Sequence, residues 1–285
     1  MEGIYNLQPE YQITMSQQEQ LSGKKGSGTQ NADVILSAAG ESHRGLLRRK
    51  NEDSFCVVYS RDRKCMLAVV ADGIGGHSRG EVASYICCRE LLNAFLKQVK
   101  TLTTAEKAKN FLAEELEKIN SAVYLRNRAN HGLTRPMGTT VNAVVFLQDC
   151  LVMANAGDSR LYQLLSGADE LKQLSTDHSF KAAVADSSDS ECVRHNMENV
   201  IYRAVGLHRN FEIELKEFTL VSGSRYLICT DGMYRQLPAN TVRDTLKKAS
   251  APRNALDVFM RTALVSGGKD NITGIAVFTK GGQNE

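Results

Sequence analysis

The chain has 285 residues, of which 42% are hydrophobic and 24% are charged, and its formal net charge is only +3. These values are typical of a globular protein that is long enough to bury a large core. The balanced charge argues against a nucleic-acid-binding face, and no apolar run reaches the roughly 18 residues that a membrane-spanning helix needs.

The first part of the chain differs in composition from the rest. Residues 1–31 are rich in Gln, Ser, Gly and Lys without hydrophobic periodicity, so we expect a disordered N-terminal arm there. Residues 32–281 contain short apolar runs and are expected to form a single domain. These runs predict strands at 34–39, 54–59, 65–71, 139–147, 150–156, 160–165, 213–220, 225–230 and 272–279.

Helical periodicity interrupts the strands and predicts helices at 80–99, 104–129, 240–249 and 253–265. The stretch at about 178–210 is polar and irregular, and we interpret it as a flap inserted over a functional edge. Hairpin-length turns favour antiparallel pairing. The order of elements therefore predicts an α+β fold, an antiparallel β-sandwich flanked by helices in four α-β-β-α layers.

Four aspartates stand beside or near glycine or asparagine at the boundaries of apolar runs. Asp72 and Asp231 directly follow runs that resemble buried strands, and Asp53 and Asp270 lie in the motifs NED and DN. A carboxylate at the mouth of a buried strand is costly without a partner, and several that converge cannot all stay ionised without a cation between them. Because hard oxygen ligands select Mg²⁺ or Mn²⁺, the sequence predicts a metal site built from carboxylates.

Seven segments carry a resemblance to a known family. The sequence reads GLLRRKNED at 45–53, DGIGGH at 72–77, MGTT at 137–140, NAGDSR at 155–160, LSTDH at 174–178, TDG at 230–232 and DN at 270–271. In this order they resemble the metal-dependent serine/threonine protein phosphatases of type 2C, in their compact bacterial form. One Asp-Gly pair is a turn in most proteins, whereas seven ordered segments spanning roughly residues 34 to 279 are specific.

The resemblance implies a central β-sandwich flanked by helices, with a dinuclear Mn²⁺ or Mg²⁺ site at one end and two metal ions per chain. Asp72 would bridge both ions, and the carbonyl of Gly73 would bind one of them. Asp231 and Asp270 would hold the other ion. Two cations about 4 Å apart would lower the pKa of a bridging water, which would then attack phosphorus without a covalent enzyme intermediate.

Three further residues receive roles from the resemblance. Glu52 and Asp53 would act mainly through metal-bound water, and Arg48 would pair with the substrate phosphate. A guanidinium fork is well shaped for a phosphate. The alternative for Arg48 is a surface arginine, because Arg49 is adjacent and the register is an inference.

A third metal that the family often binds is doubtful here. The residues 133–137 lack the aspartate expected shortly before the Gly-Thr-Thr segment, and Arg235 stands four residues after Asp231, where another would lie. Arg135 and Arg235 thus put positive charges where that cation would need ligands. We hypothesise that the chain lacks the third metal, or that arginine partly replaces its charge. Asp158 is interpreted as a structural turn residue.

The resulting functional prediction is an enzyme, a phosphoprotein phosphatase that hydrolyses phosphoserine and phosphothreonine and reverses a Ser/Thr kinase. Its partners would be phosphorylated proteins, the kinase and its targets among them, with no nucleic acid and no membrane, and we expect a monomer. Seven cysteines without CxxC spacing favour the reducing cytoplasm. Two alternatives stay open: a catalytically inactive phosphopeptide-binding module, and a metal phosphatase for a small molecule. Intact Asp72, Asp231 and Asp270 favour the first function over the inactive module.

Overall fold

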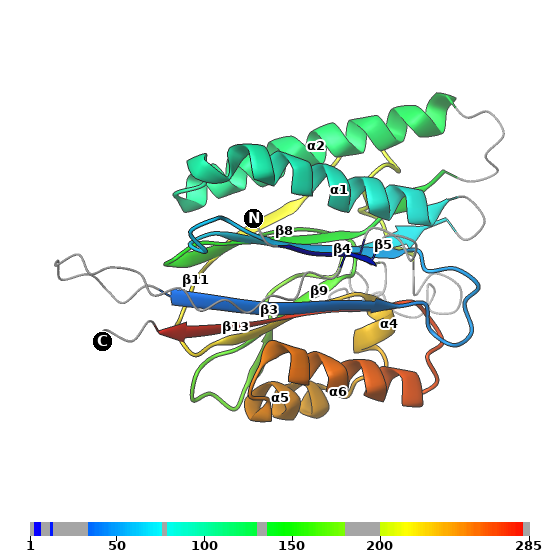
Figure 1. The fold of residues 1–285 in the computed structure, drawn as a ribbon. Coiled ribbons are helices and arrows are strands. Elements are labelled where there is room, and N and C mark those ends of the chain that lie inside the picture. The colour runs from blue at the N-terminus through cyan, green and yellow to red at the C-terminus, as the bar shows by residue number, and fades with distance from the viewer. Residues whose placement is uncertain are drawn as a thin grey trace, which may run out of the picture.

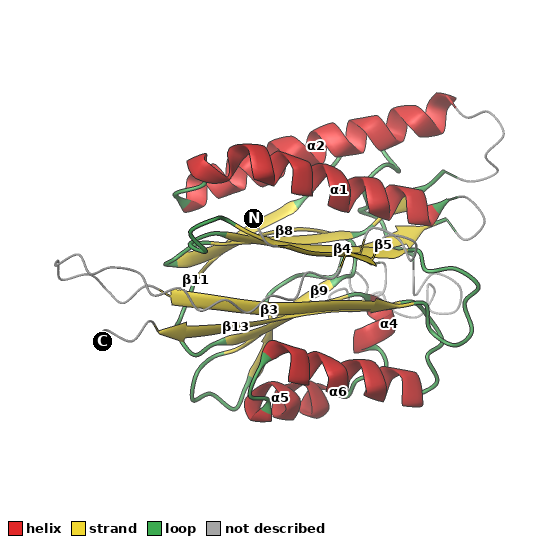
Figure 2. Cartoon of the chain, in the orientation of Figure 1, coloured by secondary structure: helices red, strands yellow, loops and turns green. Residues whose placement is uncertain are grey.

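Two β-sheets packed face to face form the centre of the protein. The computed structural model describes residues 3–6, 12–13, 34–75, 79–129, 136–179 and 200–281. Helices cover the outer face of each sheet, so the layers follow one another as helix, sheet, sheet and helix (Figures 1 and 2). The predicted α+β sandwich flanked by helices is confirmed.

The first sheet has the strand order β11-β8-β7-β5-β4-β1-β2, with β6 paired beside β5, and all its described pairings are antiparallel. Two of its strands, β1 and β2, fall inside the stretch predicted as a disordered arm; the rest of that stretch lies outside the described residues. The strands are β1 (Gly3–Asn6), β2 (Gln12–Ile13), β4 (Asp53–Tyr59), β5 (Met66–Ile74), β6 (Gly138–Thr139), β7 (Val141–Phe146), β8 (Cys150–Ala156) and β11 (Glu214–Thr219).

The second sheet has the order β10-β9-β12-β13-β3 and is also antiparallel in its described pairings. Its longest pairing joins β3 to β13, two strands from opposite ends of the domain. The sequence did not indicate β10, which has only three residues. The strands are β3 (Val34–His43), β9 (Arg160–Leu164), β10 (Leu171–Gln173), β12 (Arg225–Cys229) and β13 (Ile272–Gly281).

Each sheet carries its own helical layer. Helices α1 and α2 lie on the first sheet, and α5 and α6 lie on the second (Figure 1). The short helix α4 escaped prediction because four residues show no helical period. The bounds are α1 (Gly80–Gln98), a 3₁₀ turn (Val99–Thr101), α2 (Ala105–Ala129), α4 (Asp231–Tyr234), α5 (Ala239–Lys248) and α6 (Pro252–Val265).

Strand β5 shows why the runs of the central strands are continuously apolar. Leu67 and Val69 on one face pack beneath α1 and α2, while Met66 and Val70 on the other face pack against the second sheet. Side chains alternate between the faces of a strand, so a strand buried on both faces has no polar positions in its middle. Polar chemistry is therefore confined to the strand ends.

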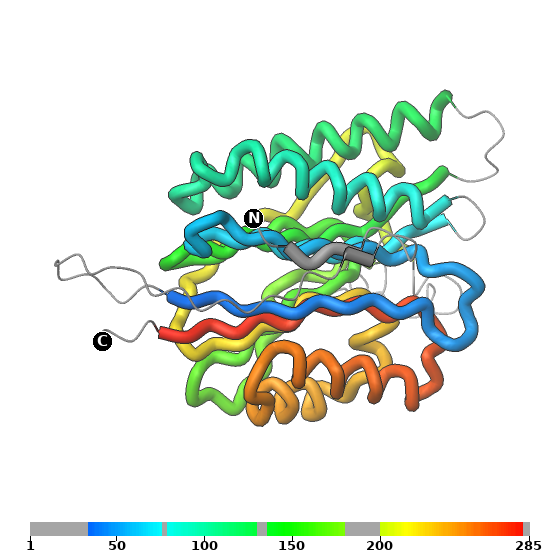
Figure 3. The backbone as a smooth tube through the Cα atoms, viewed as in Figure 1, coloured from blue at the N-terminus to red at the C-terminus, as the bar shows by residue number. Residues whose placement is uncertain are grey.

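One end of the sandwich gathers connections from distant parts of the sequence. The β3–β4 connection and the α6–β13 connection lie beside each other there (Figure 3), and the Leu46 N–H donates to the Gly268 carbonyl at 2.7 Å. At the same end, the antiparallel register of β4 and β5 places Asp53 directly opposite Asp72. The fold thus positions a set of acidic side chains at this end.

Candidate metal centre

Acidic residues from separate elements meet at this end of the sandwich. Asp53 begins β4, Asp72 stands near the end of β5, and Asp231 begins α4 directly after β12. The carboxyl groups of Asp72 and Asp231 are near enough for each to shift the pKa of the other. The two sheets thereby bring together carboxylates that are 159 positions apart in sequence, since 231 minus 72 is 159.

Asp53 is buried and only partly satisfied by hydrogen bonds. The Thr230 hydroxyl donates to its Oδ2 at 2.9 Å, whereas its buried Oδ1 has no hydrogen-bond partner among the described residues. Burial raises the pKa of Asp53 to about 7, and the negative charge of Asp231 adds to the shift. An orphaned buried carboxylate oxygen is costly in an apolar setting, so it needs a cation or a proton.

Asp72 is a partly buried carboxylate beside Asp53 and Asp231. Burial raises its pKa well above the ordinary value, and the neighbouring charges of Asp53 and Asp231 act in the same direction. Its main chain is fixed by the Gly-Thr-Thr segment, because the Asp72 N–H donates to the Thr140 hydroxyl at 3.0 Å and the Thr140 N–H donates back to the Asp72 carbonyl at 2.8 Å. The backbone that presents this carboxylate is therefore held on both sides.

Gly73 follows Asp72 at a close approach of two backbones. A Cβ at this position would lie 2.4 Å from the carbonyl of Gly80 and 2.6 Å from that of Glu52. No side chain fits between the end of β5 and the start of α1, which explains the glycine physically. The main chain of Gly73 therefore lies directly beside the acidic side chains.

Asn271 joins the segments that carry the remaining predicted residues. Its Oδ1 accepts the N–H of Glu52 at 2.8 Å, and its Nδ2 donates to the carbonyls of Arg44 and Lys50, each at 2.8 Å. Burial raises the pKa of Glu52, and the nearby charge of Glu81 adds to this. One amide side chain thus fixes the β3–β4 connection against the residue that precedes β13.

Arg48 and Asp270 form an ion pair at the rim of the acidic cluster. The Arg48 Nη2 lies 2.7 Å from the Asp270 Oδ2, and the Arg48 side chain is 46% exposed. Arg49, its neighbour in sequence, is exposed, and its carbonyl accepts a hydrogen bond from Arg44. Of these two adjacent arginines, Arg48 is the one whose side chain reaches the acidic residues.

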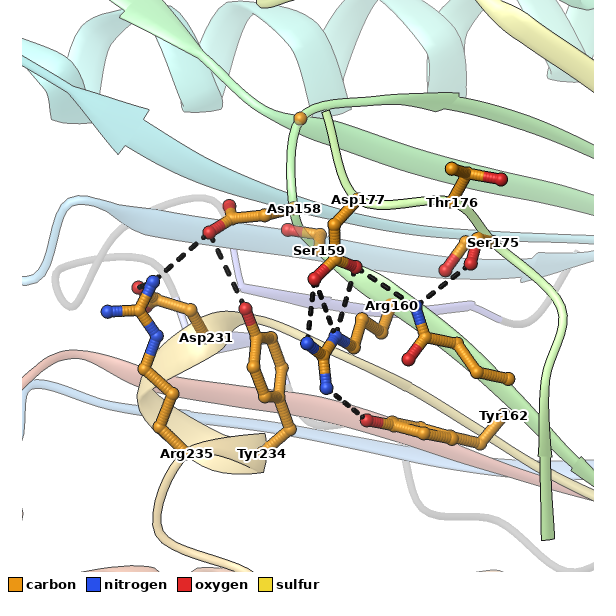
Figure 4. A network of polar contacts seen from close by, with 12 residues as sticks. Asp158, Ser159, Arg160, Tyr162, Ser175, Thr176, Asp177, Asp231, Tyr234 and Arg235 are labelled. Atoms are coloured by element: carbon orange, nitrogen blue, oxygen red, sulfur yellow. Dashed lines mark hydrogen bonds and ion pairs between the residues drawn. The ribbon is translucent and has the colours of Figure 1, made fainter. Parts of the chain in front are cut away.

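A second arginine contacts the cluster from the side of α4. The Arg235 Nη2 lies 3.3 Å from Asp158 Oδ2 and 3.2 Å from Asp231 Oδ2 (Figure 4). Burial raises the pKa of Asp158 to about 6, and Asp231 adds to the shift while Arg235 opposes it. Sequence reasoning treated Asp158 as a turn residue only. Its position two residues after the end of the buried strand β8 is a signal similar to the one that identified Asp72 and Asp231.

The donor set fits hard divalent cations. Its members are carboxylate oxygens, one of them orphaned, whose pKa values are raised mainly by burial and further by the neighbouring carboxylates. Within the described ranges, no three His, Cys, Asp or Glu side chains already surround a common point. Asp158, Asp231 and Asp270 are instead paired with arginines.

Comparison with known proteins identifies the family. The model of the Protein phosphatase 2C family matches residues 39–272. The chain belongs to this family. The predicted resemblance is thereby confirmed, and so is the enzyme class of protein phosphatases.

Named relatives and solved structures agree with the family. The chain is 32% identical over 245 residues to the serine/threonine phosphatase stp of Listeria welshimeri, covering 85% of this chain and 95% of the relative. It resembles the catalytic domain of the phosphatase PstP in complex with two manganese ions (TM-score 0.71, 30% identity, 87% of this chain and 99% of that one). PppA, a key regulatory component of T6SS in Pseudomonas aeruginosa, is similar at TM-score 0.75 and 28% identity (87% and 100% covered).

Some sequence predictions fall outside the described residues. These include Arg135, one of the two arginines argued to oppose a third metal, and 180–199, most of the predicted flap. At the base of that flap, Ser179 and Ile201 form an isolated antiparallel bridge. No helix in the described part of the chain has the length and apolarity required to cross a membrane.

Proposed function

We propose that this protein is a serine/threonine phosphoprotein phosphatase that works with two Mn²⁺ or Mg²⁺ ions bound at the acidic end of the sandwich. The observation that carries the proposal is the convergence of Asp53, Asp72 and Asp231, with a buried Asp53 oxygen that lacks a donor among the described residues. When bound there, two divalent cations would lower the pKa of a water and neutralise charge on the phosphoryl oxygens.

Each side chain receives a definite task. Asp72, whose pKa is raised by the charges of both Asp53 and Asp231, would contact both ions, and the carbonyl of Gly73 beside it would bind one of them. Asp231 and Asp270 are assigned to the other ion. The remaining carboxylates, those of Glu52 and Asp53, are proposed to orient the attacking water.

Glu52 and Asp53 are proposed to orient that water rather than to bind metal mainly by direct contact. Thr230 supports this assignment because its hydroxyl holds one oxygen of Asp53 and leaves the other available. The pKa values of Glu52 and Asp53 are raised, so each carboxylate is stabilised by a nearby cation or by binding a proton.

Arg48 is proposed to bind the substrate phosphate. Its side chain is nearly half exposed and lies at the rim, where its partner Asp270 is also half-exposed. An arginine fork can form two parallel hydrogen bonds to phosphate oxygens. The exchange of a carboxylate partner for a dianionic phosphate would therefore draw Arg48 onto the substrate.

The physiological partners are proposed to be phosphorylated proteins, among them a Ser/Thr kinase and its targets, with the protein acting as a monomer in signalling. The names of the relatives support phosphoprotein substrates. A cytoplasmic location is proposed because the six cysteines of the described residues are buried free thiols.

The test is hydrolysis of a phosphothreonine peptide by the wild type and Asp231→Asn, each with Mn²⁺ and with chelator. We expect turnover only in the sample that contains the wild type and Mn²⁺, and not in Asp231→Asn or in chelator. Asp244→Asn is the matched control, because Asp244 lies on α5 and pairs with its neighbour Arg243. Peptide binding without turnover, with Mn²⁺ bound, would instead identify a binding module. Turnover restricted to small phosphate esters would identify a metabolite phosphatase.

A further inference from the structure

Arg235 stands between two carboxylates that come from different sheets. Asp158 lies in the turn after β8, and Asp231 begins α4 after β12. A single nitrogen of Arg235 contacts one oxygen of each, at 3.3 and 3.2 Å (Figure 4). The Asp158 side chain is only 5% exposed, so its charge needs a partner within the protein.

Local geometry places Arg235 at this point. It follows Asp231 by four residues across the single turn of α4, and its N–H donates to the Asp231 carbonyl at 3.0 Å. Residues four apart on a helix share a face, so the guanidinium returns over the carboxylate that begins the turn. The contact between Arg235 and Asp231 is therefore built into the backbone.

The turn that carries Asp158 is fixed as well. Gly157 has φ +111°, and a Cβ there would lie 2.6 Å from Thr140. The His178 N–H donates to the Gly157 carbonyl at 2.9 Å, and the Gly157 N–H donates to Nδ1 of His178 at 3.3 Å. Asp158 thus has little freedom to move away from Arg235.

Neighbouring groups hold the α4 side in place. The Tyr234 hydroxyl lies 3.5 Å from Asp158 Oδ2, and the guanidinium of Arg160 stacks on the Tyr234 ring at 3.7 Å from its centroid. Arg160 in turn forms a fork with Asp177, with contacts of 2.7 to 3.2 Å. These contacts join α4, β9 and the base of the predicted flap into one network (Figure 4).

We propose that Arg235 is a built-in cation, a positioning residue that bridges Asp158 and Asp231 in the place where a further divalent ion would otherwise bind. A metal ion would draw the same two oxygens to about 2.0–2.6 Å. The guanidinium holds them with one fixed charge, orients Asp231 toward the one ion assigned to it, and closes the Asp158 side to a third. This inference rests on the proposed two-ion function and concerns the number of ions that the site accepts.

The test is Mn²⁺ stoichiometry by equilibrium dialysis with metal analysis. The wild type and Arg235→Lys, which keeps the charge, are expected to bind two ions. Arg235→Asp is expected to bind a third ion, and Asp158→Asn in that background is expected to remove it. Arg243→Asp, an exposed change of equal charge on α5, should leave the number at two.

In the binding measurement, the inference is overturned by an unchanged ion count in Arg235→Asp or by a third ion that persists after Asp158→Asn. A wild type that binds fewer than two ions would count against the proposed function instead. The contact of Arg235 with Asp158 is tested separately by measuring melting temperatures in the presence of chelator. Arg235→Ala should change the melting temperature less in the Asp158→Asn background than in the wild type, because contacting residues are not additive. Additive changes would exclude the bridge.

Discussion

The two sides of the acidic cluster use the same residue types in different ways. On the side of the β3–β4 connection, Arg48 forms one ion pair within the described ranges, with Asp270, whose side chain is 32% exposed. On the α4 side, Arg235 contacts two carboxylates and lies within the network of Tyr234 and Arg160. An arginine paired with one partly exposed carboxylate can exchange partners, whereas an arginine that bridges two carboxylates that are more deeply buried serves as a permanent charge.

The sharpest test of this difference replaces one aspartate on each side. Asp270→Asn should lower kcat/KM for a phosphothreonine peptide by on the order of 10²–10³-fold, because it removes a charge assigned to ion binding. Asp158→Asn should cost only about tenfold, the effect of a group that orients a ligand. Steady-state kinetics with saturating Mn²⁺ measure both. Equal losses in the two variants would contradict the distinction between the sides.

The second prediction concerns Arg48 and its neighbour Arg49. Arg48→Ala should reduce kcat/KM by about 10–100-fold, the expected cost of losing a charged hydrogen bond to the phosphate. Arg49→Ala should leave the kinetics unchanged, because the exposed Arg49 contacts the fold through its carbonyl. Binding of Mn²⁺ should not weaken in either variant. A larger loss in Arg49→Ala would shift the substrate contact by one residue.

The smallest expected effect is a pH dependence of stability that arises from Asp53, which lies between the two sides of the cluster. The pKa of Asp53 is raised to about 7, so the folded protein binds more protons than the unfolded chain between about pH 4 and 7. Stability in chelator should therefore fall as pH rises through this range, lowering the melting temperature by roughly 5–10 °C. Mn²⁺ should oppose the loss, increasingly so at higher pH.

Asp53→Asn is the control for this pH dependence. It removes the carboxyl group whose pKa is about 7. In chelator, the melting temperature of this variant should therefore change less with pH as the pH approaches 7. A melting temperature that rises with pH in chelator would show that the carboxylates are stabilised in their ionised form without metal. Such a result would contradict the electrostatic description of the cluster.

The sequence by itself determined the main elements of the fold. Apolar runs that are buried on both faces gave the strands β4, β7, β8, β12 and β13 within a residue or two and β5 with its end three residues too early, and periodicity gave the four longer helices. The sequence also marked Asp72 and Asp231, because a carboxylate directly after a buried strand is physically expensive. Three-residue β10 and four-residue α4 were missed because such short elements show no period.

Only the tertiary structure decided which charges meet. The register that sets Asp53 opposite Asp72 depends on strand pairing, and the pairing of Arg48 with Asp270 depends on two connections that are distant in sequence. The contact between Arg235 and Asp158 needs elements from both sheets. The local sequence shows which charged side chains will be buried at a free-energy cost. The partner that offsets this cost comes from a distant part of the chain, so only the folded structure identifies it.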